Sequence, residues 1–139
     1  MLDLILCVDD DPITLMLCKK VIQKSLLSKE IITAQNGEEA LEYFKNLNDL
    51  KSQNTAVNLP QLVFLDLNMP VMGGWEFLDE FNTTHYKHVN TIKIVVLSST
   101  VDPDDLEKAN TYPMVLDFLP KPITTSMLEY VTSKVTIAK

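Results

Sequence analysis

Arginine is absent from the 139 residues of this chain, and all 12 basic side chains are lysines. They stand against 19 acidic residues, which gives a formal net charge of −7 at pH 7. Surfaces that bind nucleic acid favour clustered basic residues, and arginine in particular because its guanidinium binds phosphate through two hydrogen bonds. The charge balance therefore argues against nucleic-acid binding.

Membrane-length apolar runs and a cysteine framework are also missing. The N-terminal apolar run ends at Val8, has no basic lead and is followed by three aspartates, so it predicts neither a signal peptide nor a membrane span. Cys7 and Cys18 are the only cysteines, and their spacing matches no metal site. We expect both to be buried free thiols in a reducing cytoplasm.

The composition is that of one globular domain. An apolar fraction of 46% excludes a disordered acidic chain. The length leaves no room for a second domain, so we expect a single domain over residues 1–139 without an attached output domain.

Five short apolar runs predict five strands. The runs are continuous rather than alternating, which is typical of strands covered on both faces in a parallel sheet. They are Leu4–Val8, Ile31–Ala34, Leu62–Leu67, Ile92–Leu97 and Val115–Leu119.

A helical pattern follows each run, although the one over Asp104–Asn110 is weak. The first helix is expected to be capped by Asp11, to begin at Pro12, and to carry its apolar stripe on Ile13, Leu17 and Val21. The polar stretch 48–60 is expected to be a surface loop. Strand and helix alternate five times, which predicts a doubly wound α/β fold with helices on both faces of the sheet.

Polar residues gather where four of the strands end, and ligands of open α/β sheets bind at that edge. The candidates are Asp9, Asp10, Asp11, Asp66, Asn68, Ser98, Ser99, Thr100 and Lys121. Clustered carboxylates repel one another and favour a cation, and hard oxygen ligands suit Mg²⁺. A lysine and a hydroxyl beside them predict phosphoryl transfer onto or through a carboxylate. Each signal alone could be no more than a polar turn or a helix cap.

Four motifs occur in order along the chain: ILCVDDD from residue 5, LDLNMPVMGG from residue 65, VLSS from residue 96 and FLPKP from residue 118. Together they resemble the receiver domain of bacterial two-component response regulators, in its single-domain, chemotaxis-receiver-like form. The resemblance covers nearly the whole chain. It implies a flavodoxin-like (βα)5 fold with strand order 2-1-3-4-5.

The resemblance also implies a metal site and a phosphoacceptor. Asp66 corresponds to the aspartate that accepts the phosphoryl group. Mg²⁺ would be bound by Asp9, Asp10 and Asp66 and by the backbone carbonyl of Asn68. Lys121 corresponds to the lysine that pairs with the phosphoryl group, and its bond to the following proline is expected to be cis.

Three further roles follow from the same resemblance. Ser98 corresponds to the hydroxyl that binds the phosphoryl group, and Phe118 to the aromatic switch residue. Asn68 and Thr100 correspond to positions that tune dephosphorylation. Gly73 stands where an acidic or polar residue is frequent in the family, but no catalytic group is missing.

The implied function is signalling. A sensor histidine kinase or a histidine phosphotransfer protein would phosphorylate Asp66, which would change the surface formed by the fourth helix, fifth strand and fifth helix. We expect a downstream protein target, no membrane partner, and a monomer or a phosphorylation-dependent dimer. Such a domain catalyses only its own phosphorylation and dephosphorylation and is not a classical enzyme.

Two other functions fit part of the pattern. A haloacid-dehalogenase-like phosphohydrolase also uses an aspartate nucleophile and Mg²⁺, but it needs a second carboxylate two residues later, where this chain has Asn68. A phosphorylation-independent interaction module is the third option. His85 and His88 are expected in a solvated loop rather than at a metal.

Overall fold

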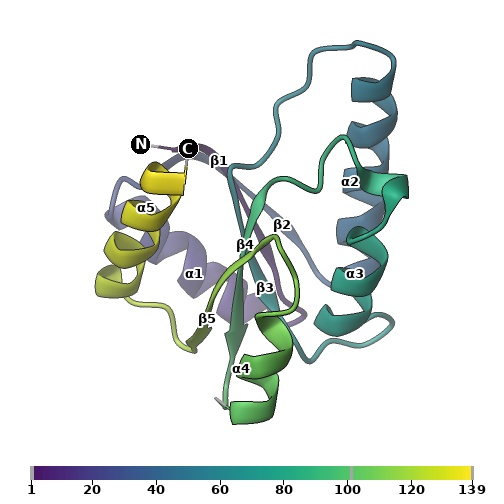
Figure 1. Cartoon of the computed structure of the whole chain (residues 1–139). Helices are drawn as coiled ribbons and strands as arrows, with labels where there is room; N and C mark the ends of the chain where they lie inside the picture. Colours follow the sequence, from purple (N-terminus) through teal and green to yellow (C-terminus); the bar gives the residue numbers. More distant parts are fainter. Residues whose placement is uncertain (1, 101, 139) are drawn as a thin grey trace.

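The computed structural model describes residues 2–100 and 102–138, and it shows a parallel five-stranded sheet between two layers of helices (Figure 1). The strands lie in the order β2-β1-β3-β4-β5, which confirms the predicted topology. They are β1 (Leu2–Val8), β2 (Ser28–Ala34), β3 (Leu62–Asp66), β4 (Lys93–Ser98) and β5 (Val115–Pro120).

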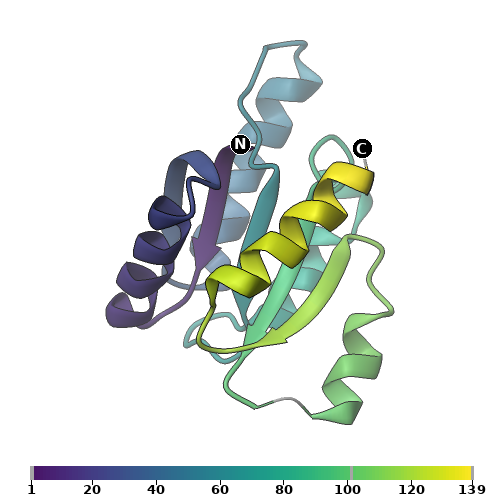
Figure 2. The ribbon, with the colours of Figure 1, turned by 90° about the vertical axis from the view of Figure 1, so that its left-hand side faces the viewer.

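Helices cover both faces of the sheet, with α1 and α5 on one face and α2, α3 and α4 on the other (Figures 1 and 2). They are α1 (Pro12–Lys24), α2 (Gly37–Ser52), α3 (Gly74–Phe81), α4 (Pro103–Ala109) and α5 (Thr125–Ala138), with a short 3-10 helix η1 (Thr84–Tyr86). No helix within the described residues is both long enough and apolar enough to cross a bilayer.

The helices on each face explain why the strand sequences are continuously apolar. On β3, Val63 and Leu65 pack into the core under α2, α3 and α4, whereas Leu62 and Phe64 pack into the core under α1 and α5. Successive side chains of a strand point to opposite faces, so a strand with two buried faces needs apolar residues at every position.

The predicted apolar stripe of α1 is wrong for two of its three residues. Ile13 and Leu17 are 63% and 49% exposed, whereas Val21 packs against the core, and the buried residues of the helix are Leu15, Cys18 and Ile22. Apolar residues occur on more than one side of this helix, so two stripes have helical spacing and the sequence alone does not select between them. The helix start is as predicted, because the Asp11 side chain accepts a hydrogen bond from the Ile13 backbone N–H at 3.0 Å.

The predicted loop over 48–60 is also wrong in its first part, because α2 continues to Ser52. Asn48 is buried on α2, where its amide nitrogen donates to the carbonyl oxygen of His85 at 2.8 Å and its amide oxygen accepts from the backbone N–H of His88 at 3.0 Å. The asparagine thus fastens α2 to the segment around η1. His85 itself is exposed, and within the described residues neither histidine belongs to a cluster of metal-ligating side chains.

Asn48→Ala is expected to lower the free energy of unfolding by about 2 kcal/mol, because it removes two hydrogen bonds that a buried side chain makes to the backbone of His85 and His88. Urea unfolding monitored by circular dichroism measures this loss. Asn46→Ala is the matched control, since Asn46 is exposed on the same helix and its loss should change stability by less than about 0.5 kcal/mol. Equal effects of the two substitutions would contradict the role given to Asn48.

Candidate functional site

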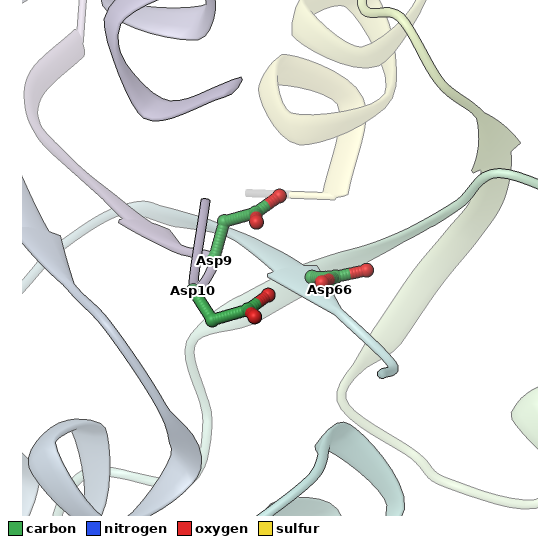
Figure 3. Close-up of side chains that lie close together, drawn as sticks. All are labelled: Asp9, Asp10 and Asp66. Atoms are coloured by element: carbon green, nitrogen blue, oxygen red, sulfur yellow. The ribbon is translucent and has the colours of Figure 1, made fainter. Parts of the chain in front are cut away.

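Three carboxylates meet at the carboxyl edge of the sheet (Figure 3). Asp9 and Asp10 follow β1, and Asp66 ends the neighbouring β3; one oxygen from each of the three lies within 4.8 Å of the others. The parallel pairing of Val8 with Leu65 places Asp9 beside Asp66. Asp9 and Asp66 are buried, each 5% exposed, whereas Asp10 faces solvent. The sequence prediction that these strand ends converge is confirmed.

Lys121 supplies the positive charge of this cluster. Its Nζ lies 2.7 Å from Asp9 Oδ2 and 3.0 Å from Asp66 Oδ1. The backbone N–H of Lys121 donates to the carbonyl oxygen of Ser98 at 2.8 Å, which holds the lysine at the end of β5. The following Lys121-Pro122 bond is cis, as predicted. One ammonium group therefore bridges the two buried carboxylates.

Burial and charge act together on the ionisation of these groups. Burial raises the pKa of Asp66, and repulsion from Asp9 and Asp10 raises it further, although Lys121 acts in the opposite direction. Burial alone would lower the pKa of Lys121, but its hydrogen bonds to Asp9 and Asp66 more than offset this and raise it. Lys121 is thus held as a cation, while the pKa of Asp66 stays raised chiefly because the carboxylate is buried.

The donor set fits a bound Mg²⁺. Three carboxylates face one ammonium group, and the pKa of Asp66 is raised, first by its burial and then by repulsion from Asp9 and Asp10. Mg²⁺ prefers oxygen ligands and keeps several waters, and the exposed Asp10 leaves the cluster open to solvent on one side. Asp11 is not part of this set, because its carboxylate caps α1 and accepts from Ile13 N–H and the Thr14 hydroxyl. Those hydrogen bonds lower the pKa of Asp11.

The remaining predicted residues lie on or just beyond strands β3, β4 and β5. Ser98 is buried at the end of β4, where its hydroxyl oxygen accepts from the Thr100 backbone N–H at 3.3 Å. Thr100 and Asn68 are exposed on the loops beyond the strands. Phe118 on β5 is 7% exposed and packs into the core under α2, α3 and α4.

Sequence reasoning missed one contact next to this site. Cys7 and Cys18 were expected as two separate buried thiols, and both are buried and free, but their Sγ atoms lie 3.5 Å apart. The hydrogen bond between them, together with burial, raises the pKa of the Cys7 thiol. The contact could be found from the sequence only by knowing which face of β1 and which stripe of α1 face each other.

Asp66→Asn is expected to raise the free energy of unfolding by about 1 kcal/mol at pH 7 without divalent cations. An aspartate with a raised pKa in the folded state stabilises the fold only below its ordinary pKa, and this contribution is lost as the pH rises through the folded-state pKa. The gain from the substitution should therefore disappear in acid, where Asp66 is protonated.

Urea unfolding at neutral and acid pH measures the stability difference. Asp10→Asn is the control, because Asp10 is exposed and its substitution relieves repulsion without removing a buried charge. A loss of stability in Asp66→Asn at pH 7 would show that its pairing with Lys121 outweighs its burial.

Comparison with known proteins agrees with this geometry. The family model described as "Response regulator receiver domain" matches residues 5–132. A two component response regulator from Cytophaga hutchinsonii has a similar structure, with a TM-score of 0.82, 30% sequence identity and 98% of each chain covered.

Curated relatives also match in sequence, among them two named regulators. The probable methanogenesis regulatory protein FilR2 of Methanothrix harundinacea is 27% identical over 121 residues, which are 87% of this chain and 73% of FilR2. The response regulator Rcp1 of Synechocystis is 28% identical over 102 residues, which are 73% of this chain and 65% of Rcp1. The chain thus spans only part of the length of these relatives.

These matches bear on one of the two alternative functions that the sequence left open. The haloacid-dehalogenase-like alternative is not supported, because the matching family and the similar proteins are response regulators. The strand order and the placement of the acidic cluster agree with the family match, which covers residues 5–132. The chain therefore belongs to the response regulator receiver domain family and is a signalling domain.

Proposed function

We propose that Asp66 accepts a phosphoryl group from a sensor histidine kinase or a histidine phosphotransfer protein. The observation that carries this proposal is the cluster of Asp9, Asp10 and Asp66 with Lys121 between the two buried carboxylates. Mg²⁺ would be held by these three carboxylates and by the backbone carbonyl of Asn68. When bound, it supplies positive charge that lowers the repulsion between the carboxylates and the incoming phosphoryl group.

Asp66 is the nucleophile in this reaction. Its carboxylate oxygen attacks phosphorus while the bond from phosphorus to the donor's histidine nitrogen breaks, which leaves an acyl phosphate on Asp66. The pKa of Asp66 is raised, but the contact with Lys121 at 3.0 Å favours the ionised form that the attack requires. Asp9 and Asp10 lie close to Asp66, so their negative charges also repel an anionic donor. These charges must be balanced before the donor approaches.

Lys121 and Ser98 would then bind the new phosphoryl group. Lys121 Nζ already contacts Asp66, so a phosphoryl oxygen on Asp66 can replace Asp9 as its second partner. Ser98 is buried at the end of β4 and linked to Thr100 by a hydrogen bond, so movement of its hydroxyl toward the phosphoryl group would pull the loop before α4. The exposed Asn68 and Thr100 would flank the water that later hydrolyses the acyl phosphate.

The output would be a change in the surface formed by α4, β5 and α5. Phe118 pairs with Val96 across β4 and β5, which places the ring beside the strand that ends in Ser98. The ring is buried in this structure, so we propose that phosphorylation raises the population of this arrangement rather than creating a new one. The changed surface would bind a downstream protein, or a second copy of the chain in a phosphorylation-dependent dimer.

Incubation with Mg²⁺ and a small acyl phosphate, followed by intact mass spectrometry, tests the chemistry. The parent should gain one phosphoryl group, about 80 Da, and lose it after the donor is removed. Asp66→Asn should gain none, while Asp49→Asn, which alters an exposed aspartate on α2, should behave like the parent. Chelation of Mg²⁺ should prevent the gain.

Uptake of phosphate by Asp66→Asn would refute the proposed acceptor. Uptake by the parent at an unchanged rate after chelation would refute the proposed metal requirement. Either result would be visible in the same mass measurement.

A further inference from the structure

Cys7 and Cys18 form a contact that the proposed phosphoryl chemistry does not use. Cys7 lies on β1 two residues before Asp9, and Cys18 lies on the buried stripe of α1. Their Sγ atoms are 3.5 Å apart, and the side chains are 2% and 5% exposed. Two thiols in van der Waals contact inside a core are close to the geometry of a disulfide.

We propose that Cys7 and Cys18 form an intramolecular disulfide when the protein meets a peroxide, which joins α1 covalently to β1 next to Asp9. A disulfide S–S bond is about 2.05 Å long, so the sulfurs must approach by roughly 1.5 Å. Cys7 belongs to a strand that is paired on both sides, with β2 and with β3. The helix α1 has no such strand pairing and is less constrained than β1, so we expect α1 to move.

A cavity gives a small oxidant access to Cys18. Its volume is about 240 Å³, and its lining includes Cys18, Thr14, Leu97 and Lys121. It also includes Leu17, which is 49% exposed, so the cavity reaches the surface of the molecule. A molecule the size of hydrogen peroxide fits this space, because one water occupies about 30 Å³ in the liquid. Cys7 does not line this cavity, so Cys18 is the thiol that reacts first with the peroxide.

The chemistry takes place in two steps. The Cys18 sulfur attacks one oxygen of the peroxide, the O–O bond breaks, and the products are a sulfenic acid on Cys18 and one water that carries the thiol proton. The Cys7 sulfur then attacks the Cys18 sulfur, the S–O bond breaks, and the Cys7 proton leaves with the hydroxyl as a second water. The two sulfurs are oxidised to the disulfide, and the peroxide is reduced to two waters.

The bond would close the segment between Cys7 and Cys18, which are 11 positions apart and enclose Asp9, Asp10 and Asp11. A cross-link of this kind restricts the unfolded chain and so raises the thermal midpoint. Oxidation would thus stiffen the strand-to-helix connection that carries the first two carboxylates of the acidic cluster.

Treatment of the purified chain with hydrogen peroxide, alkylation with iodoacetamide in denaturant and intact mass spectrometry test the proposal. The oxidised parent should lose about 2 Da, take up no alkyl group and return to two alkylated thiols after reduction with dithiothreitol. Lys19 is the first basic residue, so trypsin leaves both cysteines on one peptide and the bond is read as a 2 Da loss from that peptide. Cys18→Ala should show no such loss.

Three results would overturn the proposal: two alkylatable thiols after peroxide treatment, addition of oxygen to cysteine without the 2 Da loss, or disulfides between chains only. The parent's own reaction decides the matter even if Cys18→Ala folds poorly. Asp66→Asn should form the disulfide as readily as the parent, which separates this proposal from the phosphoryl chemistry. A higher thermal midpoint of the oxidised parent, reversed by dithiothreitol, is the second expected result.

Discussion

Lys121→Ala is expected to lower the free energy of unfolding by about 2–3 kcal/mol at neutral pH without divalent cations. The substitution removes the only ammonium group within contact distance of Asp9 and Asp66 among the described residues, and both carboxylate side chains are 7% exposed. Two buried charges that repel each other would then lack a counter-charge. Removal of one partner from a buried ion pair costs more than the pair itself contributes, because the other charge stays buried.

Urea unfolding of Lys121→Ala and Lys134→Ala provides a matched comparison. Lys134 also forms an ion pair, with its Nζ 2.9 Å from Asp117 Oδ2, but its side chain is 36% exposed and it lies away from the acidic cluster. Its loss should cost less than about 1 kcal/mol, as is usual for partly exposed pairs. Equal losses of stability in the two variants would contradict the view that burial makes the ion pairs of Lys121 the more important for stability.

Two further measurements separate the structural part of this effect from the chemical part. Mg²⁺ should raise the free energy of unfolding of Lys121→Ala more than that of the parent, because a cation at the cluster replaces the missing charge. The rate of phosphoryl uptake from a small acyl phosphate should nevertheless stay about 100-fold below that of the parent, since removal of one positioned charge from a transferred phosphoryl group has an effect of this order. Recovery of both stability and rate would refute a direct role for Lys121 in the transfer.

The acidic cluster could be predicted from the sequence because its geometry follows from the topology. The carboxyl ends of parallel strands lie at one edge, so residues at or directly after the ends of β1, β3 and β5 lie there whatever the exact helix packing. Asp9, Asp66 and Lys121 are such residues, and the distances of 2.7 and 3.0 Å from Lys121 to the two carboxylates confirm their convergence.

The buried face of α1 and the place of Asn48 could not be predicted in the same way. Ile13 and Leu17 have the spacing of a buried stripe but lie in solvent, because the rotation of α1 about its axis is set by packing on β1 and α5 rather than by local pattern. Asn48 is a polar residue in a polar stretch, and only the position of the His85 segment beside α2 makes it a buried hydrogen-bonding residue. Both errors concern contacts between elements that are distant in sequence.

Gly74→Ala, at the first residue of α3, is expected to cost about 3 kcal/mol of stability. A Cβ at this position would lie 2.6 Å from the carbonyl oxygen of Asp66 and 2.9 Å from the Cα of Leu67. Both are backbone atoms, so no side-chain rotation relieves the clash. Either α3 must move away from the sheet, or the end of β3 must shift with Asp66.

Gly73→Ala is the matched control for this prediction. A Cβ there would meet the carbonyl oxygen of Leu67 at 3.0 Å and nothing else closer than 3.9 Å, and the residue has an ordinary φ of −80°. We expect a loss below about 1 kcal/mol in urea unfolding.

The effect of Gly74→Ala on phosphoryl uptake then tests whether the position of Asp66 depends on the close approach of residue 74 to its backbone. Because the clash falls on the backbone of Asp66 itself, the folded fraction of Gly74→Ala should take up phosphate at least about tenfold more slowly than the parent, since small misplacements of a reacting group have large effects on rate. Gly73→Ala should react at the parent rate. If Gly74→Ala unfolds more easily but its folded fraction reacts normally, α3 absorbs the displacement and the position of Asp66 is set by its strand pairing with Leu97 instead.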